Sequence, residues 1–212
     1  MNKEELIDLY KKESAITFNN ITNSKIEEFV DMIFEAYDSE RTVFAAANGG
    51  GASYVQNLVV DLNIHPFVSE DKGSQEVFRN KFKCINLCAD QATITGISND
   101  LGFEHIFSEQ LKYDGVGGDL VIGFSGSGNS KNILELFKAA KNKGMKTVLF
   151  TRNEVNKCNE FSDLVVCVVG TSIYPGQTGG NNNNFHLEDI CSKITHIAVG
   201  LLKNKVQNEN KS

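Results

Sequence analysis

Gly118-Asp-Leu-Val-Ile-Gly-Phe-Ser-Gly-Ser-Gly-Asn-Ser130 is the most informative stretch of this 212-residue chain. An apolar strand over residues 120–124 runs directly into a loop of Ser, Gly and Asn, and a helical pattern begins at Lys131. Serine hydroxyls, small residues and a helix N-terminus together predict a pocket for a small phosphate ester. The loop has neither the Lys of a P-loop nor the G-x-G-x-x-G of a dinucleotide fold, which argues against ATP and NAD. An ordinary strand-to-helix turn is the alternative interpretation.

The rest of the chain alternates apolar strand-like runs with helical segments. Strands are predicted over 42–47, 82–87, 120–124, 146–151 and 164–169. Helices are predicted over 3–18, 23–38, 52–64, 104–112, 130–142 and 185–203. The continuous apolar character of the later strands is typical of parallel strands that are covered on both faces. The order of elements therefore predicts an α/β fold, a three-layer sandwich around a mostly parallel five-stranded sheet.

No linker or internal repeat divides the chain, so we expect one domain over 1–212. Within it, we expect an N-terminal helical hairpin (1–38), an α/β core (39–204) and a polar, frayed tail (205–212). The apolar stripes of the hairpin belong either to the core or to an oligomer seam. Residues 66–80 and 170–184 are expected to be loops, and Ser98-Asn-Asp-Leu-Gly102 has the composition of a turn.

Composition limits the classes of partner. The formal net charge is −6, which argues against sequence-independent binding to nucleic acid, since such binding needs clustered Lys and Arg. No apolar run approaches the roughly 20 residues that span a bilayer, and the charged N-terminus lacks a signal-peptide core. Five cysteines without a metal-binding spacing are expected to be reduced thiols. We therefore expect a cytoplasmic protein with neither a membrane nor a nucleic-acid partner.

Four motifs of the chain occur together in one known family. Asn48-Gly-Gly50 opens a second loop after a strand, and Ser98-Asn-Asp-Leu-Gly-Phe-Glu-His-Ile-Phe-Ser108 matches the pattern S-N-D-x-G-F-x-x-I-F-S. Ser125-Gly-Ser-Gly-Asn-Ser130 matches the loop S-T-S-G-N-S with one substitution, and Ile194-Thr-His-Ile197 belongs to the predicted last helix. Together these motifs resemble the sugar isomerase (SIS) family, and within it the phosphoheptose isomerases, which keep a histidine at the position of His196. The resemblance covers nearly the whole chain.

The resemblance implies a flavodoxin-like fold and an aldose–ketose isomerase that works through an enediol. It implies sedoheptulose 7-phosphate as substrate and D-glycero-D-manno-heptose 7-phosphate as product, which would supply heptose for lipopolysaccharide or capsule. It also implies a homotetramer with active sites at subunit junctions, N-terminal helices used for oligomerisation, and bound zinc in many members.

The resemblance also implies residue roles. The acid/base pair carries over to Asp61 and His196. Substrate-binding positions carry over to Asn48, Gly49, Gly50, Asn99, Asp100, Ser125, Gly126, Ser127, Ser130 and Glu188. A zinc ion, if bound, would be held by Asp61, Glu188 and His196.

The chain departs from the family pattern at several of these positions. Asn57 and Asp61 replace a His and a Glu, and Glu188 replaces a Gln. Gly51 replaces a Ser, and Gly126 replaces the residue between the first two loop serines. A neutral amide such as that of Asn57 is a poor zinc ligand. Eight residues of helix separate Glu188 from His196, about 12 Å of rise, so both reach one ion only by pointing toward each other.

Several alternatives remain open from the sequence alone. Asp61 could be a solvent-facing residue and His196 a histidine of the core. His65 is first of all a helix-end residue, with contact to substrate as the alternative, and His186 has the character of a surface or interface residue. At the level of function, the alternatives are a non-catalytic SIS module that binds a replication initiator or another protein partner, and a sugar-phosphate sensor.

Overall fold

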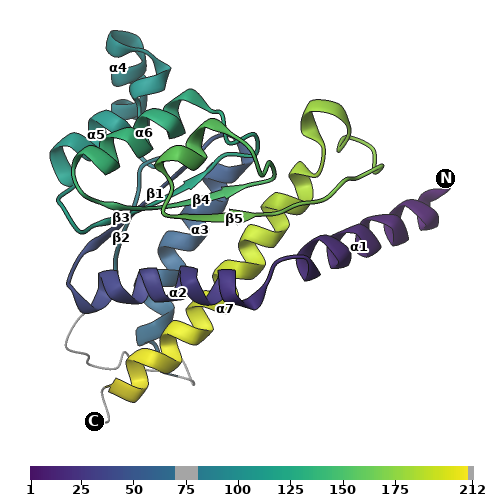
Figure 1. The fold of residues 1–212 in the computed structure, drawn as a ribbon, viewed down its shortest axis with the longest axis horizontal. Coiled ribbons are helices and arrows are strands. Elements are labelled where there is room, and N and C mark those ends of the chain that lie inside the picture. Colours follow the sequence, from purple (N-terminus) through teal and green to yellow (C-terminus); the bar gives the residue numbers. More distant parts are fainter. Residues whose placement is uncertain (70–80, 210–212) are drawn as a thin grey trace.

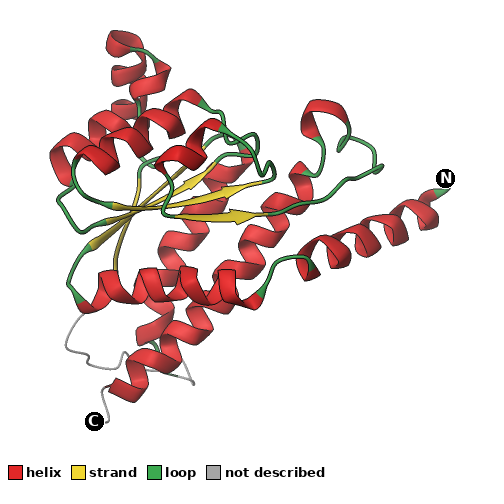
Figure 2. Cartoon of the chain, in the orientation of Figure 1, coloured by secondary structure: helices red, strands yellow, loops and turns green. Residues whose placement is uncertain are grey.

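The structure, a computed structural model, describes residues 1–69 and 81–209. Most of the loop expected over 66–80 and the end of the tail lie outside the described residues. Five parallel strands form one sheet in the order β2-β1-β3-β4-β5 (Figures 1 and 2). They are β1 (Thr42–Ala47), β2 (Lys83–Asn86), β3 (Leu120–Phe124), β4 (Lys146–Thr151) and β5 (Leu164–Cys167). The predicted α/β architecture with a five-stranded parallel sheet is confirmed.

Seven α-helices lie in the described residues. They are α1 (Lys3–Asn19), α2 (Asn23–Asp38), α3 (Gly50–Ile64), α4 (Gln91–Leu101), α5 (Ser108–Asp114), α6 (Lys131–Asn142) and α7 (Asn184–Glu209). Short 3-10 turns occur at His65–Phe67, Phe103–His105, Lys157–Phe161 and Gly179–Asn181. The helix predicted over 104–112 is therefore a 3-10 turn followed by α5.

The sheet separates two apolar cores because alternate side chains of a strand point to opposite faces. In β1, Val43, Ala45 and Ala47 belong to the core shared with α2, α3 and α7. Phe44 and Ala46 belong to the core covered by α5 and α6. Figure 1 shows α5 and α6 on one face of the sheet and α2, α3 and α7 on the other, which makes the predicted three layers.

The order of the strands creates one position where a ligand site is expected. The chain leaves β1 through α3 toward β2 on one side, and leaves β3 through α6 toward β4 on the other. The loops that follow β1 and β3 therefore diverge and leave a crevice at the carboxyl edge of the sheet. Ala47 pairs with Phe124 at the ends of these strands, which brings Asn48 beside Ser125.

Ser98-Asn-Asp-Leu-Gly102 is not the turn that its composition predicts. Residues 98–101 form the last turn of α4, and only Gly102, with φ of +102°, leaves the helix. Asp90 starts this helix, because its carboxylate accepts hydrogen bonds from the backbone N–H groups of Ala92 and Thr93. The cap lies well upstream of the turn-forming residues, so a local composition argument misses the helix.

The two ends of the chain also differ from expectation. The last helix continues to Glu209, into the tail that was expected to be frayed, because Val206 is buried in the core. The N-terminal helices do not fold back on each other as a hairpin: α1 projects from the body and α2 follows it along the sheet (Figure 1). α1 instead contacts α7, where Tyr10 donates a hydrogen bond to Asp189 and Lys193 donates one to Ser14.

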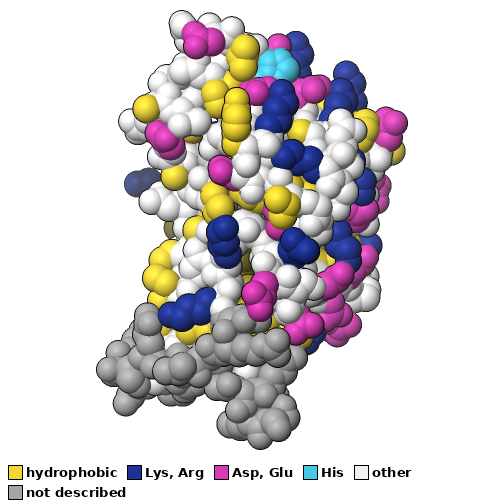
Figure 3. All heavy atoms as spheres, turned by 90° about the vertical axis from the view of Figure 1, so that its left-hand side faces the viewer, with side chains coloured by type: hydrophobic (Ala, Val, Ile, Leu, Met, Phe, Trp, Pro, Cys, Tyr) yellow, Lys and Arg dark blue, Asp and Glu magenta, His cyan; other side chains and the backbone are white. Residues whose placement is uncertain are grey.

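On the face shown in Figure 3, Lys and Arg side chains are interspersed with Asp and Glu and form no single-sign field. No helix within residues 1–69 and 81–209 is both long and apolar enough to cross a membrane.

Truncation of Val206 tests whether the end of α7 belongs to the core. Val206→Ala should lower the free energy of unfolding by about 2 kcal/mol, because it removes two buried methyl groups. Asn208→Ala, on the exposed side of the same turn, should change it by less than about 0.5 kcal/mol. Urea denaturation measures both values, and equal effects would mean that the tail does not pack as described.

Candidate functional site

The serine loop, residues 125–130, lies between β3 and α6. The hydroxyls of Ser125 and Ser130 are 2.9 Å apart, and the backbone N–H of Ser130 donates to Ser125 Oγ at 3.4 Å. Ser127 Oγ accepts from the N–H of Asn129 at 3.1 Å, which leaves its own proton for a ligand. Hydrogen bonds within the loop therefore hold these hydroxyls in place.

The first turn of α6 faces the same place. Ser130 is the residue before the helix, yet its side chain makes no capping hydrogen bond and contacts Ser125 instead. Asn132, in the first turn, exchanges two hydrogen bonds with Asn48 at 2.7 and 3.0 Å. This pair ties the loop after β1 to the helix after β3. Free N–H groups and the positive end of the helix dipole are thereby held beside the serines, where they favour an anion.

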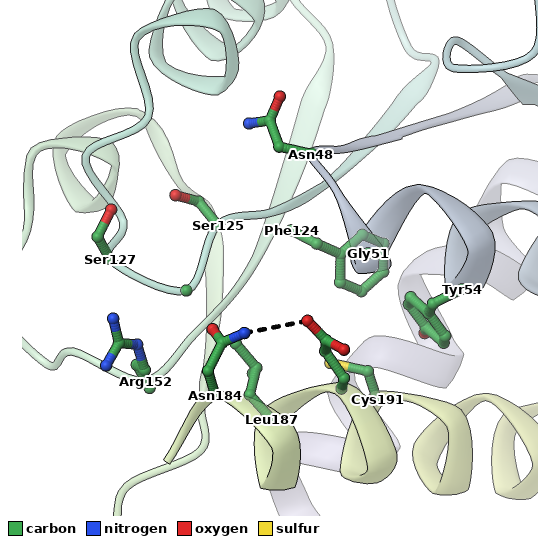
Figure 4. Close-up of a pocket in the computed structure, with 12 residues that line it drawn as sticks. Asn48, Gly51, Tyr54, Phe124, Ser125, Ser127, Arg152, Asn184, Leu187 and Cys191 are labelled. Atoms are coloured by element: carbon green, nitrogen blue, oxygen red, sulfur yellow. Dashed lines mark hydrogen bonds between the residues drawn. The ribbon is translucent and has the colours of Figure 1, made fainter. Parts of the chain in front are cut away.

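A cavity of about 250 Å³ opens at this edge of the sheet (Figure 4). In the close-up, Ser127 and Arg152 lie at one end, and Tyr54 and Cys191 lie at the other. The lining residues are Asn48, Gly51, Tyr54, Phe124, Ser125, Gly126, Ser127, Arg152, Asn184, Leu187, Glu188 and Cys191. Five of the predicted substrate-binding residues thus share one cavity: Asn48, Ser125, Gly126, Ser127 and Glu188. Ser130 supports them through Ser125.

Glu188 is the carboxylate in the wall of this cavity. Its Oε1 accepts a hydrogen bond from Asn184 Nδ2 at 3.0 Å, drawn as the dashed line in Figure 4. Burial raises the pKa of Glu188 above its ordinary value, and the hydrogen bond from Asn184 offsets part of that rise. A Cβ on Gly50 would lie 2.9 Å from Glu188 Oε2, so glycine at this position lets the carboxylate approach the start of α3.

Asp61 and His196, the predicted acid/base pair, come together on α3 and α7. The Asp61 carboxylate is buried and lies 3.5 Å from His196 Nε2 and 3.3 Å from His65 Nε2. The His196 side chain is 64% exposed and that of His65 is 55% exposed. Asp61 is therefore not a solvent-facing residue, and His196 is not a histidine of the core. His65 contacts Asp61.

This pair does not line the cavity of the serine loop. Asp61 is ten residues along α3 from Gly51, about 15 Å of helix, and His196 is eight residues along α7 from Glu188, about 12 Å. Within one chain the predicted phosphate contacts and the predicted acid/base pair are two separate groups.

The predicted zinc ligands do not fit a metal ion within one chain. Asp61 and His196 are neighbours, but Glu188 lies in the cavity and is bonded to Asn184. Among the described residues, no three His, Cys, Asp or Glu side chains lie close enough together to hold a metal. We therefore derive no chemical step through a metal ion.

Asn99, Asp100 and His186 do not line the cavity, and neither do the predicted Gly49 and Gly50. Asn99 and Asp100 are exposed on α4, where the Asn99 amide donates to the Asp100 carboxylate at 2.8 Å. His186 is fully buried and its Nε2 lies 3.3 Å from Glu13 Oε2, so its expected surface position is wrong. Glu13 and Tyr10 of α1 contact the His186 side chain, and the local sequence around His186 does not reveal these contacts.

The sequence analysis missed Arg152 and Asn184, whose polar side chains line the cavity. Arg152 directly follows β4, so the rule that ligands bind at the carboxyl ends of parallel strands could have found it. Asn184 is the last of four consecutive asparagines, and nothing in that run distinguishes it from its neighbours.

Comparison with known proteins places the chain in a family. The SIS domain matches residues 10–151, about two thirds of the chain. The chain belongs to the SIS domain family. The phosphoheptose isomerase of Sulfurimonas denitrificans is 31% identical to this SIS protein over 80% of the present chain and 83% of its own length.

Solved structures share the fold. The structure of a phosphoheptose isomerase from Neisseria gonorrhoeae matches with a TM-score of 0.78 at 20% identity, over 96% of this SIS chain and all of that one. A phosphoheptose isomerase from Francisella tularensis matches with a TM-score of 0.76 at 20% identity, over 96% of this chain and all of that one. The resemblance to the SIS family inferred from four motifs is confirmed.

The raised pKa of Glu188 predicts a pH-dependent contribution to stability. A carboxyl whose pKa is higher in the folded state than its ordinary 4.5 favours folding while it is protonated. That contribution is present below the ordinary value and is lost as pH rises through the raised value. Glu188→Gln should therefore be more stable than the unmodified protein at pH 7, and the difference should shrink toward pH 4.

Urea denaturation at several pH values between 4 and 8 measures this difference. Glu160→Gln, which removes the same charge from an exposed position, is the matched control. A stability difference for Glu188→Gln that does not change with pH would contradict the inferred environment of this carboxyl.

Proposed function

We propose that this protein is an aldose–ketose isomerase that converts sedoheptulose 7-phosphate to D-glycero-D-manno-heptose 7-phosphate. The observation that carries the proposal is the serine loop at the carboxyl edge of the sheet, beside the N-terminus of α6 and inside a cavity of sugar-phosphate size. Similarity over most of the chain to a curated phosphoheptose isomerase supports the choice of substrate.

The reaction moves one proton between two neighbouring carbons of an open-chain sugar. A base removes a proton from C1 while an acid gives a proton to the carbonyl oxygen on C2, which forms the enediol. A proton is then delivered to C2 as the hydroxyl on C1 loses its own, which leaves an aldehyde at C1. We assign the base to Asp61 and the acid to His196, because the two are 3.5 Å apart and both kinds of group can carry protons in such steps.

The assigned acid/base pair needs a second subunit to meet the phosphate. Asp61 and His196 lie too far along α3 and α7 to line the cavity of their own chain, yet both imidazoles beside Asp61 are open to the surface. Exposed Val60 and Ile64 on α3 and exposed Ile197 and Leu201 on α7 give these helices the apolar character of a contact surface. We infer a homotetramer in which the pair of one subunit faces the serine loop of another.

The same proposal includes the setting. The N-terminal helices would contribute to the oligomer, since Ile7 and Ile16 on α1 are exposed. Asn99 and Asp100 on the projecting α4 would reach substrate at such a junction. The isomerase would act in the cytoplasm and supply heptose for a surface polysaccharide.

Incubation with sedoheptulose 7-phosphate, followed by NMR, tests the activity. We expect a new anomeric signal from an aldose phosphate. Asp61→Asn and His196→Asn should each lower kcat by about 10²- to 10⁴-fold, the usual contribution of a positioned acid or base, with little change in fold. Circular dichroism checks the fold of each variant.

Two outcomes would contradict these assignments. If the unmodified protein binds the phosphate but gives no new sugar phosphate, the chain is a sugar-phosphate sensor or a module for a protein partner. If Asp61→Asn and His196→Asn retain activity while Glu188→Gln lowers kcat by about 10²- to 10⁴-fold, the base is Glu188 in the cavity.

Mixing two inactive variants tests the junction. His196→Asn keeps an intact serine loop, and the double variant Ser125→Ala/Ser127→Ala keeps an intact acid/base pair. If each active site combines groups from two subunits, co-expressed mixed oligomers should regain part of the activity that neither variant shows alone. A mixture as inactive as its components, with mixed oligomers present by two-tag purification, would place the whole site within one chain.

A further inference from the structure

Arg152 lies at the edge of the cavity, directly after β4. Its backbone N–H donates to the carbonyl of Gly126 at 3.2 Å, which fixes it beside the serine loop. Its two terminal nitrogens donate to the carbonyls of Asn182 and Gly180. Its Nε is buried and has no hydrogen-bond partner. The guanidinium is therefore held in place by the chain while part of its donor capacity is unused.

Arg152 is also a cation without a counter-charge. In the described part of the chain, no carboxylate forms an ion pair with it, and its neighbours at the terminal nitrogens are neutral carbonyls. Partial burial lowers the pKa of Arg152, which reflects the cost of keeping a charge there. A half-buried cation of this kind is stabilised when an anion binds beside it.

Gly126, the loop residue next to Arg152, leaves room for the arginine side chain. A Cβ on Gly126 would lie 2.6 Å from Asn184 Oδ1 and 3.3 Å from Arg152 Nε. The bulkier residue that the family loop carries at this position would displace both side chains. Glycine at position 126 therefore leaves the space beside the loop that the side chain of Arg152 occupies.

We propose that Arg152 binds the phosphate group of the substrate together with Ser125 and Ser127. The inference rests on the proposed function in that the ligand is a phosphate ester. In Figure 4 the labelled side chains of Ser127 and Arg152 lie at the same end of the cavity, so the phosphate binds there. A planar guanidinium suits a phosphate dianion, and it supplies the positive charge that a loop of serines and glycines lacks.

The same contacts connect ligand binding to the segment before α7. Arg152 holds the carbonyls of Gly180 and Asn182, and Asn184 extends from that segment to Glu188. A phosphate bound to Arg152 therefore also stabilises the wall of the cavity that carries Asn184.

Substitution of Arg152 tests the proposal with two ligands. Arg152→Gln should raise KM for sedoheptulose 7-phosphate and the Kd for inorganic phosphate by roughly 10- to 100-fold, with a smaller change in kcat. Arg152→Lys, which keeps the charge but loses the contacts of the planar fork, should recover part of that loss. Arg41→Gln removes an equal charge near the opposite edge of the sheet and should change neither value.

A pH profile separates binding from a purely structural role. The second proton of a phosphate ester is lost near about pH 6, so KM of the unmodified protein should rise as the dianion disappears. That rise should be smaller in Arg152→Gln, because the favoured charge partner is gone. Loss of the contacts to Gly180 and Asn182 alone would not change the preference for the dianion.

The outcomes for the two proposals are distinct. If phosphate binding depends on Arg152 but sedoheptulose 7-phosphate is not turned over, this inference is supported and the isomerase proposal is rejected. If sedoheptulose 7-phosphate is turned over and Arg152→Gln changes neither KM nor the Kd for phosphate, this inference is overturned and the isomerase proposal stands. Failure of inorganic phosphate to bind the unmodified protein at millimolar concentration also overturns it.

A second measurement needs no variant, in case Arg152→Gln does not fold. Phenylglyoxal modifies arginine side chains, and mass spectrometry reports the rate at each one. Inorganic phosphate should slow modification of Arg152 and leave the rate at exposed Arg41 unchanged. Equal rates at Arg152 with and without phosphate would overturn the assignment.

Discussion

The chain leaves β1 through α3 toward one side of the sheet and leaves β3 through α6 toward the other, and this divergence positions the candidate site. Parallel strands send their connections back over the faces of the sheet, so the loops after these two strands separate and leave a crevice. The register of Ala47 with Phe124 places Asn48 and Ser125 side by side at that crevice. The reciprocal hydrogen bonds between Asn48 and Asn132 then fix the loop after one strand to the helix after the other.

Electrostatics determines what such a crevice can hold. Hydroxyls, backbone N–H groups and a helix N-terminus favour an anion but carry no full charge. Arg152 adds that charge from the end of β4, and Glu188 stands in the same cavity on α7. Burial raises the pKa of Glu188 above its ordinary value, so a negative charge at this position costs free energy.

Within one chain the serine loop lies apart from Asp61 and His196, and this separation limits how both groups can act on one substrate. Asp61 is a buried carboxylate flanked by two exposed imidazoles, and exposed apolar side chains lie on the same helices. Such a surface is typical of a contact with another protein chain. A long sugar phosphate has its reacting carbons at the end opposite to its phosphate. In the proposed oligomer, a junction between subunits would satisfy both requirements, because one chain would supply the phosphate contacts and another the proton carriers.

The sequence by itself determined the layers, the parallel sheet and the location of the serine loop, because these follow from local periodicity and from a strand that runs into a loop. It also indicated Asp61 and His196 through a family motif. Only the tertiary structure shows that Asp61 is buried beside His196 and that His186 is buried against Glu13. The reason is that packing of α3 and of α1 against α7 sets these contacts, and the spacing of residues along one helix does not report them. The place of Val206 in the core likewise depends on packing against residues that are far away in the sequence.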